Sequence, residues 1–576
     1  MATGETAFAY HEPAIATILN QTGFLLVLNL VNVCLDKLLY CGLIGQLFVG
    51  ILWGTPGAKW LDRDMETVIQ QLGYLGLIML VYEGGLSTSL PALKTNLLLS
   101  LAVAITGIGA PMGLSFILKE MVSATPLQAF SAGAALSATS LGTTFTILST
   151  TDLIKTRLGT VTTSAAMLDD VVGLVMVQII TNLGGSSDSF SAVTVIRPVF
   201  VSIGFGVGVL LACIFCIRPI LRLILAHRSK FPQFTGTVQF YFLVYTYLLV
   251  GLVAGATYAG TSSLFAAYLA GVVTSWIDDF SKENSVAEDT SHMATGSSTE
   301  DVSQEQDSTP EEPKTTQHGQ VNRPLASVPP SNQNNEAPSG KLVYEKYYHA
   351  PVIRILIPLF FASIGFAIPI TEMFNGKIVW RGVVYAILMM FGKLITGLWL
   401  VRFSFRPVSS MVRIIKRPFS RAVLFCARPT ATAEKQKKEK LKAQTQTTDP
   451  SHPPNTEHRE IFSGSTNEPT QQLNSPLSSS LPPKPKSLYP ASILGLAMVS
   501  RGEVGYLIAS LAESQRIFGT SSSGKSSETY LVIVWAISLC TLIGPICVGT
   551  LVKRVKALQR KRVDQGGLDP LGVWGI

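Results

Sequence analysis

Apolar residues in this chain occur in long runs rather than in alternating or amphipathic patterns. About thirteen of these runs are long enough to cross a bilayer, because about 20 helical residues span the hydrocarbon core. They are residues 13–35, 38–54, 66–86, 96–118, 127–149, 160–182, 195–217, 235–257, 262–279, 352–371, 378–401, 488–511 and 529–552. The pattern predicts an all-α, polytopic membrane protein.

Two long polar segments interrupt this series of spans. Residues 281–345 are rich in Ser, Thr, Glu, Pro and Asn, and residues 403–486 are rich in Ser, Thr, Pro, Gln and Lys. Neither composition can bury a core, so both are predicted to be disordered cytosolic loops. The predicted organisation is a first membrane region at 1–280, a loop at 281–345, two helices within 346–402, a basic loop at 403–486, two helices within 487–555 and a basic tail at 556–576.

Composition agrees with this class of protein. Of the 576 residues, 47% are hydrophobic and only 14% are charged, well below the roughly 25% of soluble domains. The net charge of +8 does not indicate a nucleic-acid partner, because the basic residues cluster beside the seventh, eleventh and last spans. An odd number of spans places these clusters on one side, which the positive-inside rule makes cytosolic.

The predicted topology therefore has a non-cytosolic N-terminus and a cytosolic C-terminus, in the plasma membrane or an endomembrane. The first apolar run has no basic residues before it, so we expect a retained span rather than a cleaved signal peptide.

Two adjacent carboxylates, Asp169 and Asp170, lie near the middle of the predicted helix 160–182. A single Asp at the bilayer centre costs about 2.5–3.5 kcal/mol, so the pair requires a cation, a water-filled cavity or a bound ion. Neighbouring side chains on a helix point about 100° apart. One carboxylate can therefore face a protein partner while the other faces a cavity. The alternative, a pair at a helix end among the headgroups, is disfavoured because the apolar run continues beyond Asp170.

The fifth span is unusually rich in hydroxyl side chains. Thr139 and Ser140 lie in ALSATSLGTTFTILSTT, which also contains Gly142. This density predicts a broken helix whose freed backbone groups face a cavity. A continuous helix whose hydroxyl groups bond to their own carbonyls is the alternative.

Two later spans carry charges among apolar residues. Lys393 lies in FGKLITG, which predicts a lysine buried within the membrane. The alternative is that its side chain snorkels to the cytosolic surface. Arg501 and Glu503 flank Gly502, which predicts a second broken helix, with a simple intramembrane ion pair as the alternative. Two breaks in corresponding parts of the chain outline two inverted repeats with crossed broken helices.

The segments that carry these charges resemble a known family. Leu168-Asp169-Asp170 with the preceding TSAAM, IPLFFASIGF, FGKLITG and SRGEVGYLIA are similar to monovalent cation:proton antiporters of the second cation:proton antiporter family. The likeness includes Kef and NapA-type proteins and, in particular, fungal sodium/hydrogen exchanger family proteins. It covers nearly all of the membrane-embedded chain and neither polar loop.

The resemblance implies an NhaA/NapA-like fold, a homodimer in the bilayer, and exchange of Na⁺, K⁺ or both for protons by alternating access. It also implies that an Asp-Asp pair accompanies electrogenic exchange. Kef-type proteins carry a nucleotide-binding domain with a GxGxxG turn, and no such motif follows the last span here, so we expect no gating of that kind and no cofactor.

A carboxylate that faces water can hold a proton or a metal cation, and not both. We expect Asp170 to exchange the cation for a proton and to bind it together with Asp169. The resemblance makes Lys393 the salt-bridge partner of Asp169. Thr139 and Ser140 would orient the site. The remaining charged pair, Arg501 and Glu503, would support the crossed helices.

Two other classes remain open on sequence alone. A cation channel could use the carboxylates as a selectivity ring, and a receptor or scaffold could use the long loops to bind partners. An enzyme is not expected, since no paired catalytic motif is present in the spans or loops.

Overall fold

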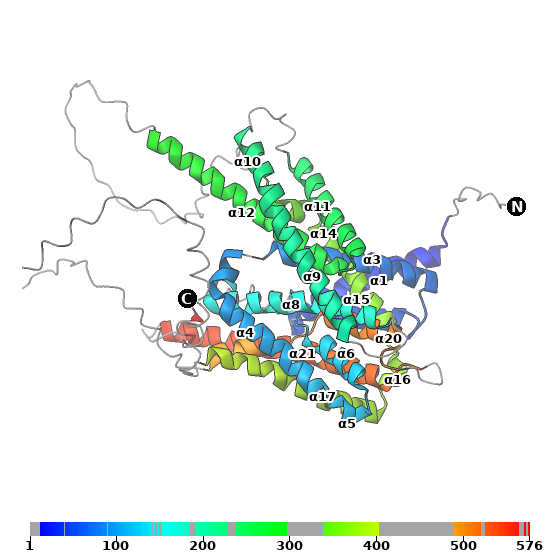
Figure 1. Ribbon diagram of the computed structural model, residues 1–576. Helices are drawn as coiled ribbons and strands as arrows, with labels where there is room; N and C mark the ends of the chain where they lie inside the picture. The colour runs from blue at the N-terminus through cyan, green and yellow to red at the C-terminus, as the bar shows by residue number, and fades with distance from the viewer. Residues whose placement is uncertain are drawn as a thin grey trace, which may run out of the picture. The chain divides into compact units, whose positions relative to one another are not determined.

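The computed structural model describes residues 12–39, 41–88, 90–140, 142–144, 148, 153–184, 192–227, 237–295, 338–401, 488–519, 525–563, 570–571 and 574–575. Every regular element within these segments is a helix (Figure 1). Inside a bilayer each backbone polar group must be bonded within the protein, and a helix satisfies this requirement with its own residues. The prediction of an all-α membrane fold is therefore confirmed.

The helices differ widely in length, and several are joined end to end by short 3₁₀ or π-helical turns (η). In chain order they are α1 (Ile15–Leu39), α2 (Gly42–Trp53), α3 (Arg63–Leu86), α4 (Leu90–Ser115), α5 (Leu118–Val122), α6 (Pro126–Ser137), η1 (Leu153–Lys155), α8 (Arg157–Gly184), α9 (Ala192–Ala212), η2 (Cys213–Ile217), α10 (Arg218–Ala226), α11 (Val238–Ala259), α12 (Ser263–Thr295), α13 (Gly340–Tyr347), α14 (His349–Pro351), η5 (Val352–Leu356), α15 (Ile357–Phe366), α16 (Ile370–Met373), α17 (Gly376–Leu394), η6 (Ile395–Leu400), α19 (Tyr489–Ala497), α20 (Glu503–Ser514) and α21 (Glu528–Val563).

Among the described residues, nine helical segments are long and apolar enough to cross a membrane. They are Ile15–Leu38, Arg63–Leu86, Asn96–Val122, Arg157–Gly184, Ile196–Ile224, Val238–Ala259, His349–Phe366, Gly376–Leu400 and Glu528–Arg562. Each coincides with a predicted span. The other four predicted spans fall on α2, on α12, and on two helices interrupted at mid-length, one starting with α6 and the other formed by α19 and α20. A total of thirteen is reached only when such short and interrupted segments are counted.

Several predicted boundaries differ from the observed helix ends. α21 continues to Val563, well beyond the predicted end of its span at 552, because Lys and Arg are good helix formers and stabilise a helix C-terminus. Helical structure also enters both ends of the predicted loop 281–345, since α12 runs to Thr295 and α13 begins at Gly340. The intervening residues 296–337 and the predicted loop 403–486 lie outside the described residues.

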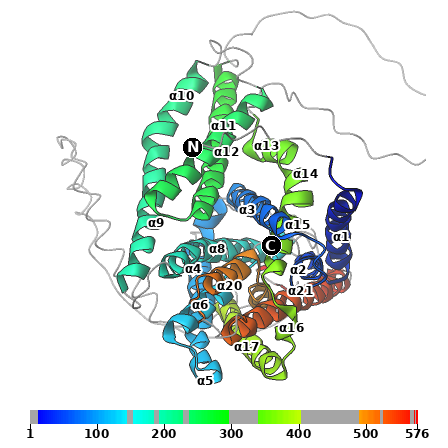
Figure 2. The same cartoon turned by 90° about the vertical axis from the view of Figure 1, so that its right-hand side faces the viewer.

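The helices pack in two neighbouring sets (Figures 1 and 2). In one set, α8 contacts α4, α6 and α20, while α17 contacts α4 and α21. In the other, α3 packs between α12 and α15, and α15 continues the contacts to α2. The interrupted helices belong to the first set, so the charged residues of α8 and α17 lie beside the interruptions.

Close helix approach at glycines holds the second set together. A Cβ atom on Gly85 of α3 would overlap the Tyr268 carbonyl of α12, and one on Gly271 of α12 would overlap the Tyr82 carbonyl of α3. Lipid tails are as apolar as leucine, so van der Waals contact rather than water exclusion drives helix association. Glycine at both positions permits that contact.

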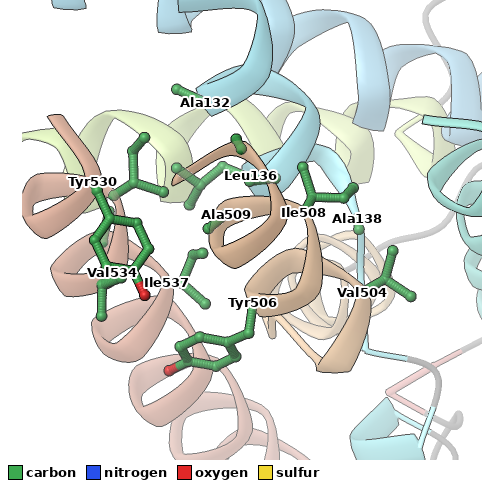
Figure 3. Packing of buried hydrophobic residues seen from close by; sticks show 14 of the residues in the cluster. Ala132, Leu136, Ala138, Val504, Tyr506, Ile508, Ala509, Tyr530, Val534 and Ile537 are labelled. Atoms are coloured by element: carbon green, nitrogen blue, oxygen red, sulfur yellow. The ribbon is translucent and has the colours of Figure 1, made fainter. Parts of the chain in front are cut away.

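Buried side chains from α6, α20 and α21 form the packing behind the interruptions (Figure 3). Leu136, Tyr506 and Tyr530 are each almost completely buried there. The Tyr506 hydroxyl is 2.9 Å from Ser538 Oγ, so its polar end is bonded within the protein. This packing fixes α20 against α21 and thereby positions the N-terminus of α20 at the site.

Candidate functional site

The first interruption follows α6, which ends at Ser137 although neither Gly nor Pro is present there. Ala138 is extended, with φ −60° and ψ 136°. The last carbonyls of a helix have no intrahelical donor. Here Ser137 Oγ donates to the Ala134 carbonyl at 2.9 Å, and Arg501 Nη1 donates to the carbonyls of Ser137 at 3.4 Å and Ala138 at 3.2 Å. These bonds allow α6 to end inside the membrane part of the protein.

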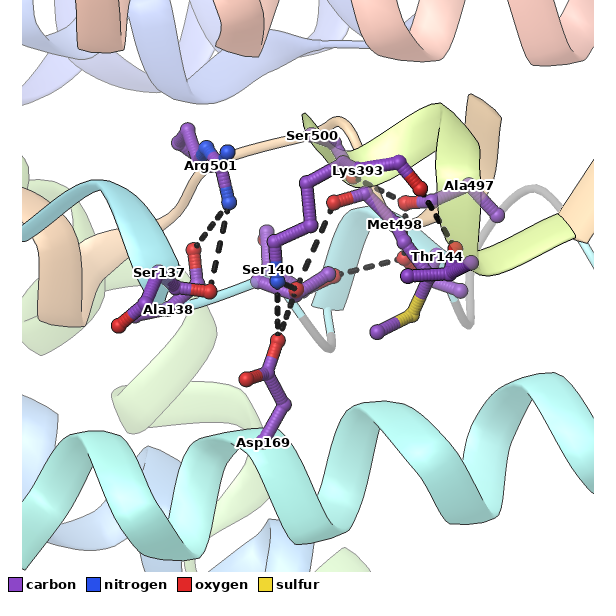
Figure 4. Close-up of polar contacts among 12 residues, drawn as sticks. Ser137, Ala138, Ser140, Thr144, Asp169, Lys393, Ala497, Met498, Ser500 and Arg501 are labelled. Carbon is purple, nitrogen blue, oxygen red and sulfur yellow. Dashed lines mark hydrogen bonds and ion pairs between the residues drawn. The ribbon is translucent and has the colours of Figure 1, made fainter. Parts of the chain in front are cut away.

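The second interruption separates α19 from α20. Ser500 Oγ donates to the Ala497 carbonyl at 2.9 Å, and Gly502 is extended at the start of α20. The two interruptions cross, because the Ser140 backbone N–H donates to the Ser500 carbonyl at 2.9 Å (Figure 4). A Cβ atom on Gly502 would lie only 2.8 Å from Ser140 Cβ. Glycine at this position is therefore required for the crossing, and the predicted pair of crossed broken helices is confirmed.

Asp169 and Lys393 form a buried ion pair beside the crossing (Figure 4). Lys393 Nζ is 2.6 Å from Asp169 Oδ2 and 2.8 Å from Thr139 Oγ1. The Thr139 hydroxyl in turn donates to the same Asp169 oxygen. Neither charged side chain is exposed, so the Lys393 ammonium does not snorkel to the surface. A buried ion pair is tolerated when further hydrogen bonds support it, and Thr139 supplies one.

Asp170 differs from Asp169 in its surroundings. It is partly exposed, whereas Asp169 is almost fully buried. In each of the two carboxylates the Oδ1 atom is buried and has no hydrogen-bond partner among the described residues. Two adjacent carboxylates thus offer two unused oxygens beside the helix crossing.

Arg501 and Glu503 do not pair with each other. The structure describes three ion pairs: Lys393–Asp169, Arg381–Glu528 and Lys341–Glu345. Apart from the two carbonyls at the end of α6, the Arg501 guanidinium has no hydrogen-bond partner among the described residues, and its Nε and Nη2 atoms are buried. A cation beside a helix C-terminus is favourable, so the contacts of Arg501 are those of a cap rather than of an ion-pair partner.

The predicted site residues therefore divide by the contacts that they make. Thr139, Asp169 and Lys393 touch one another, whereas Ser140 contributes its backbone, rather than its hydroxyl, to the crossing. Sequence reasoning missed the backbone carbonyl groups that the interruptions expose. No polar or charged pattern signals them, since a carbonyl is present at every position.

Among the described residues, no group of three or more His, Cys, Asp and Glu side chains is arranged to hold a metal ion. The oxygens available at the crossing come instead from two aspartates, a threonine hydroxyl and backbone carbonyls. Such hard ligands suit alkali cations.

The sequence also matches a known family model. Residues 24–300 match the model for the transmembrane domain of sodium/hydrogen exchangers. Over this part of its length the chain is similar to sodium/hydrogen exchangers. The matched range contains the Asp169–Asp170 pair and the first interruption, while Lys393 and the second interruption lie beyond it.

Individual relatives agree with this similarity. The chain is 30% identical over 164 residues to the probable Na⁺/H⁺ antiporter GerT of Bacillus cereus, an alignment covering 28% of this chain and 43% of GerT. It is 29% identical over 270 residues to the cation/H⁺ antiporter 17 of Arabidopsis thaliana, covering 43% of this chain and 31% of that protein. The matches thus span less than half the length of these relatives.

The structure of the sodium proton antiporter MjNhaP1 from Methanocaldococcus jannaschii aligns with 94% of this chain and 99% of its own, at 13% identity and a TM-score of 0.49.

Proposed function

We propose that the protein is a secondary active antiporter that exchanges Na⁺, K⁺ or both for protons by alternating access. The observation that carries this proposal is the pair of buried, unpartnered Oδ1 atoms of Asp169 and Asp170 at the crossing of two interrupted helices. Buried polar atoms are normally bonded, and an exception calls for a ligand or a chemical role. A proton or an alkali cation satisfies a carboxylate oxygen in this position.

The names of the relatives support these substrates. GerT is named as a probable Na⁺/H⁺ antiporter, and another Bacillus cereus relative, GerN, as a Na⁺/H⁺-K⁺ antiporter. We therefore include both cations in the proposal. A homodimer in the bilayer is part of the same proposal.

The contacts suggest how the exchange proceeds. Asp170, as the more exposed carboxylate, receives the cation and releases its proton. The cation then competes with the Lys393 ammonium for Asp169, and Lys393 gives up a proton as this ion pair weakens. Thr139 keeps Asp169 Oδ2 in place during the competition. If two protons leave for each monovalent cation that binds, each cycle moves net charge and the exchange is electrogenic.

A proteoliposome assay tests this function. Purified protein is reconstituted with a pH-sensitive dye inside the vesicles, and Na⁺ or K⁺ is added with and without a clamped membrane potential. We expect cation-dependent proton movement, a rate that depends on the potential, and no signal from Asp170→Asn vesicles. Large ion currents without proton counterflow would indicate a channel, and absence of any ion movement would favour a receptor or scaffold.

A further inference from the structure

Two residues of the tail beyond α21, Leu571 and Trp574, are buried against the rest of the protein. Leu571 is 1% exposed and Trp574 is 8% exposed. The Trp574 backbone N–H donates to the Leu571 carbonyl at 3.2 Å, which holds the two residues in one turn. We call these two residues the tail latch. Because large apolar side chains are driven out of water, their burial shows that the tail latch is docked on a protein surface.

The surface that the tail latch covers is one end of a buried apolar cluster. The first turns of α8 and the end of α21 both contribute to this cluster, which contains Leu158 and Val161 of α8, Val552 and Val555 of α21, and both latch residues. The tail latch thus ties the region beyond α21 to the start of α8 through shared apolar packing.

A cation–π contact gives this docking a specific partner. The Arg157 guanidinium carbon lies 5.1 Å from the centre of the Trp574 ring, within the roughly 6 Å at which such a contact is favourable. Arg157 is the first residue of α8, where the helix dipole disfavours a cation. The arginine therefore does not stabilise α8 by itself, and its contact with Trp574 gives it a role at this position.

The helix that begins at Arg157 also carries the aspartate pair. Asp169 lies about 18 Å along α8 from Arg157, at 1.5 Å per residue, and no proline interrupts the helix between them. The start of α8 is held closely by η1 as well, since a Cβ atom on Gly159 would overlap the Leu153 carbonyl. A contact at the first residue of α8 therefore restrains the helix that positions the carboxylates.

Both partners of the contact lie on one side of the membrane in the predicted topology. An even number of predicted spans separates Arg157 from the tail, and the basic residues beside the last span make that side cytosolic under the positive-inside rule. The contact between Arg157 and Trp574 is then formed in the cytosol, where it can be made and broken without crossing the bilayer.

We propose that Leu571 and Trp574 form a regulatory latch, which holds α8 in the arrangement seen here and slows exchange while it is docked. The proposal rests on the antiport function proposed above and adds a control element to it. Alternating access requires the helices around the site to take two arrangements. A contact that is present in only one of them stabilises that one, so release of the latch raises the maximal rate of exchange.

The test uses full-length variants and a peptide added in trans. Trp574→Ala removes the ring, Trp574→Phe keeps a smaller one, and Arg157→Gln removes the cation without opening the apolar cluster. Trp380→Ala is the matched control, because Trp380 of α17 is 69% exposed. The readouts are the maximal rate and the KM for Na⁺ and K⁺ in proteoliposomes, and thermal stability in detergent.

The peptide has the sequence of residues 564–576 and carries a fluorescein label. Its binding to the Trp574→Ala protein in detergent is followed by fluorescence anisotropy, and its effect on exchange is measured with peptide on both sides of the vesicle membrane. The same peptide with the Trp574→Ala change is its control.

We expect Trp574→Ala and Arg157→Gln each to raise the maximal rate about twofold to tenfold, the range for loss of one cation–π contact. The KM should not change, because neither residue touches the carboxylates. The double variant should be no faster than Trp574→Ala alone, since both changes remove the same contact. Trp574→Phe should lie between these variants and the wild type, and Trp380→Ala should match the wild type. The wild-type peptide should bind the Trp574→Ala protein and lower its rate, and the control peptide should do neither.

A Trp574→Ala protein with a wild-type or lower maximal rate would overturn the proposal, even at reduced thermal stability, because the tail would then only support packing. If Trp574→Ala does not fold, Arg157→Gln decides: a raised rate supports the latch, and an unchanged rate rejects it. Failure of the wild-type peptide to bind would reject the latch alone. Absence of exchange by the wild type would reject the antiport function, so the two failures are distinguishable.

Discussion

Two aspartates of this protein lie on long helices within polar clusters, yet their oxygens are used differently. Asp278 on α12 accepts a hydrogen bond from the Tyr245 hydroxyl at 3.1 Å and another from the Gly340 backbone N–H at 2.7 Å, one on each oxygen. Asp170 on α8 has a buried Oδ1 atom without a partner in the described chain. One carboxylate is saturated with bonds, and the other is not.

The surroundings of Asp278 extend this contrast. Around it, a tyrosine cluster made of Tyr82, Tyr245 and Tyr344 joins α3, α11, α12 and α13. Tyr344 donates to Glu83 at 3.0 Å, and the Tyr82 hydroxyl is 3.3 Å from Thr274 Oγ1. Tyrosine hydroxyl groups and a backbone N–H donate the hydrogen bonds that these two carboxylates accept. The cluster therefore stabilises helix packing, whereas under the proposed function the unsatisfied carboxylates at the crossing give up stability for binding.

The strongest test of this contrast is Asp170→Asn. We expect exchange to fall to the background of empty vesicles, with folding retained or improved, because Asn is nearly isosteric and removes a buried charge. Asp170→Glu should keep residual activity with weaker cation binding, since the charge is displaced by one methylene. The measurements are proteoliposome exchange and thermal stability of the same preparations. Wild-type rates in the Asn variant would remove Asp170 from the mechanism.

The next effect concerns the one buried ion pair at the crossing. Lys393→Ala leaves Asp169 without its cation, and breaking a buried pair in this way commonly costs about 3–5 kcal/mol. We expect a large drop in thermal stability that a Lys393→Ala, Asp169→Asn double variant partly recovers. Strictly additive losses in this cycle would mean that the two side chains do not interact.

Asp278→Asn is the matched control for Asp170→Asn. It should lower thermal stability and leave exchange unchanged, whereas Asp170→Asn should abolish exchange and retain or improve stability. The amide keeps one acceptor oxygen but places an NH₂ group opposite a donor, at a cost of about 1–3 kcal/mol for the unsatisfied group. We expect lower thermal stability and a cation KM like that of the wild type. Lost exchange in a stable Asp278→Asn protein would show that the tyrosine cluster takes part in transport.

The smallest effect is expected from the predicted loop between α12 and α13. Replacing residues 298–335 with a short Gly-Ser linker keeps Asp278, Ser339 and Gly340, and with them the bond that joins the two sides of the loop. Because so polar a segment contributes no core, thermal stability and exchange should match those of the full chain. A well-expressed deletion without exchange would show that the loop acts on the transporter.

Sequence alone identified most of the residues that the structure places at the helix crossing. The runs of apolar residues predicted the helices, and Asp169, Asp170, Lys393 and Arg501 stood out because a charge inside such a run is costly wherever the run packs. The hydroxyl-rich segment around Thr139 and the glycine at 502 predicted the two interruptions. These are local properties, so they can be recognised without knowing the neighbours.

Which groups meet was decided by the tertiary structure. The pairing of Lys393 with Asp169, 224 residues apart, followed from family resemblance rather than from the residues themselves. The alternative of a simple ion pair between Arg501 and Glu503 could be decided only by the structure, in which Arg501 donates to the carbonyls of Ser137 and Ala138 instead. The sequence also did not predict a contact at the start of α8, where the Arg157 guanidinium lies over the ring of the buried Trp574. Trp574 belongs to the C-terminal tail, which was predicted only to be basic.

The sequence by itself therefore determined that this chain forms apolar helices and which charges lie among apolar residues, and it predicted where two helices break, because the cost of placing a residue in hydrocarbon depends on that residue and its near neighbours. The tertiary structure decided which of those charges are satisfied and which remain open to a cation. Satisfaction depends on carbonyls, hydroxyls and helix ends brought together from distant parts of the chain, and helix packing alone sets their distances.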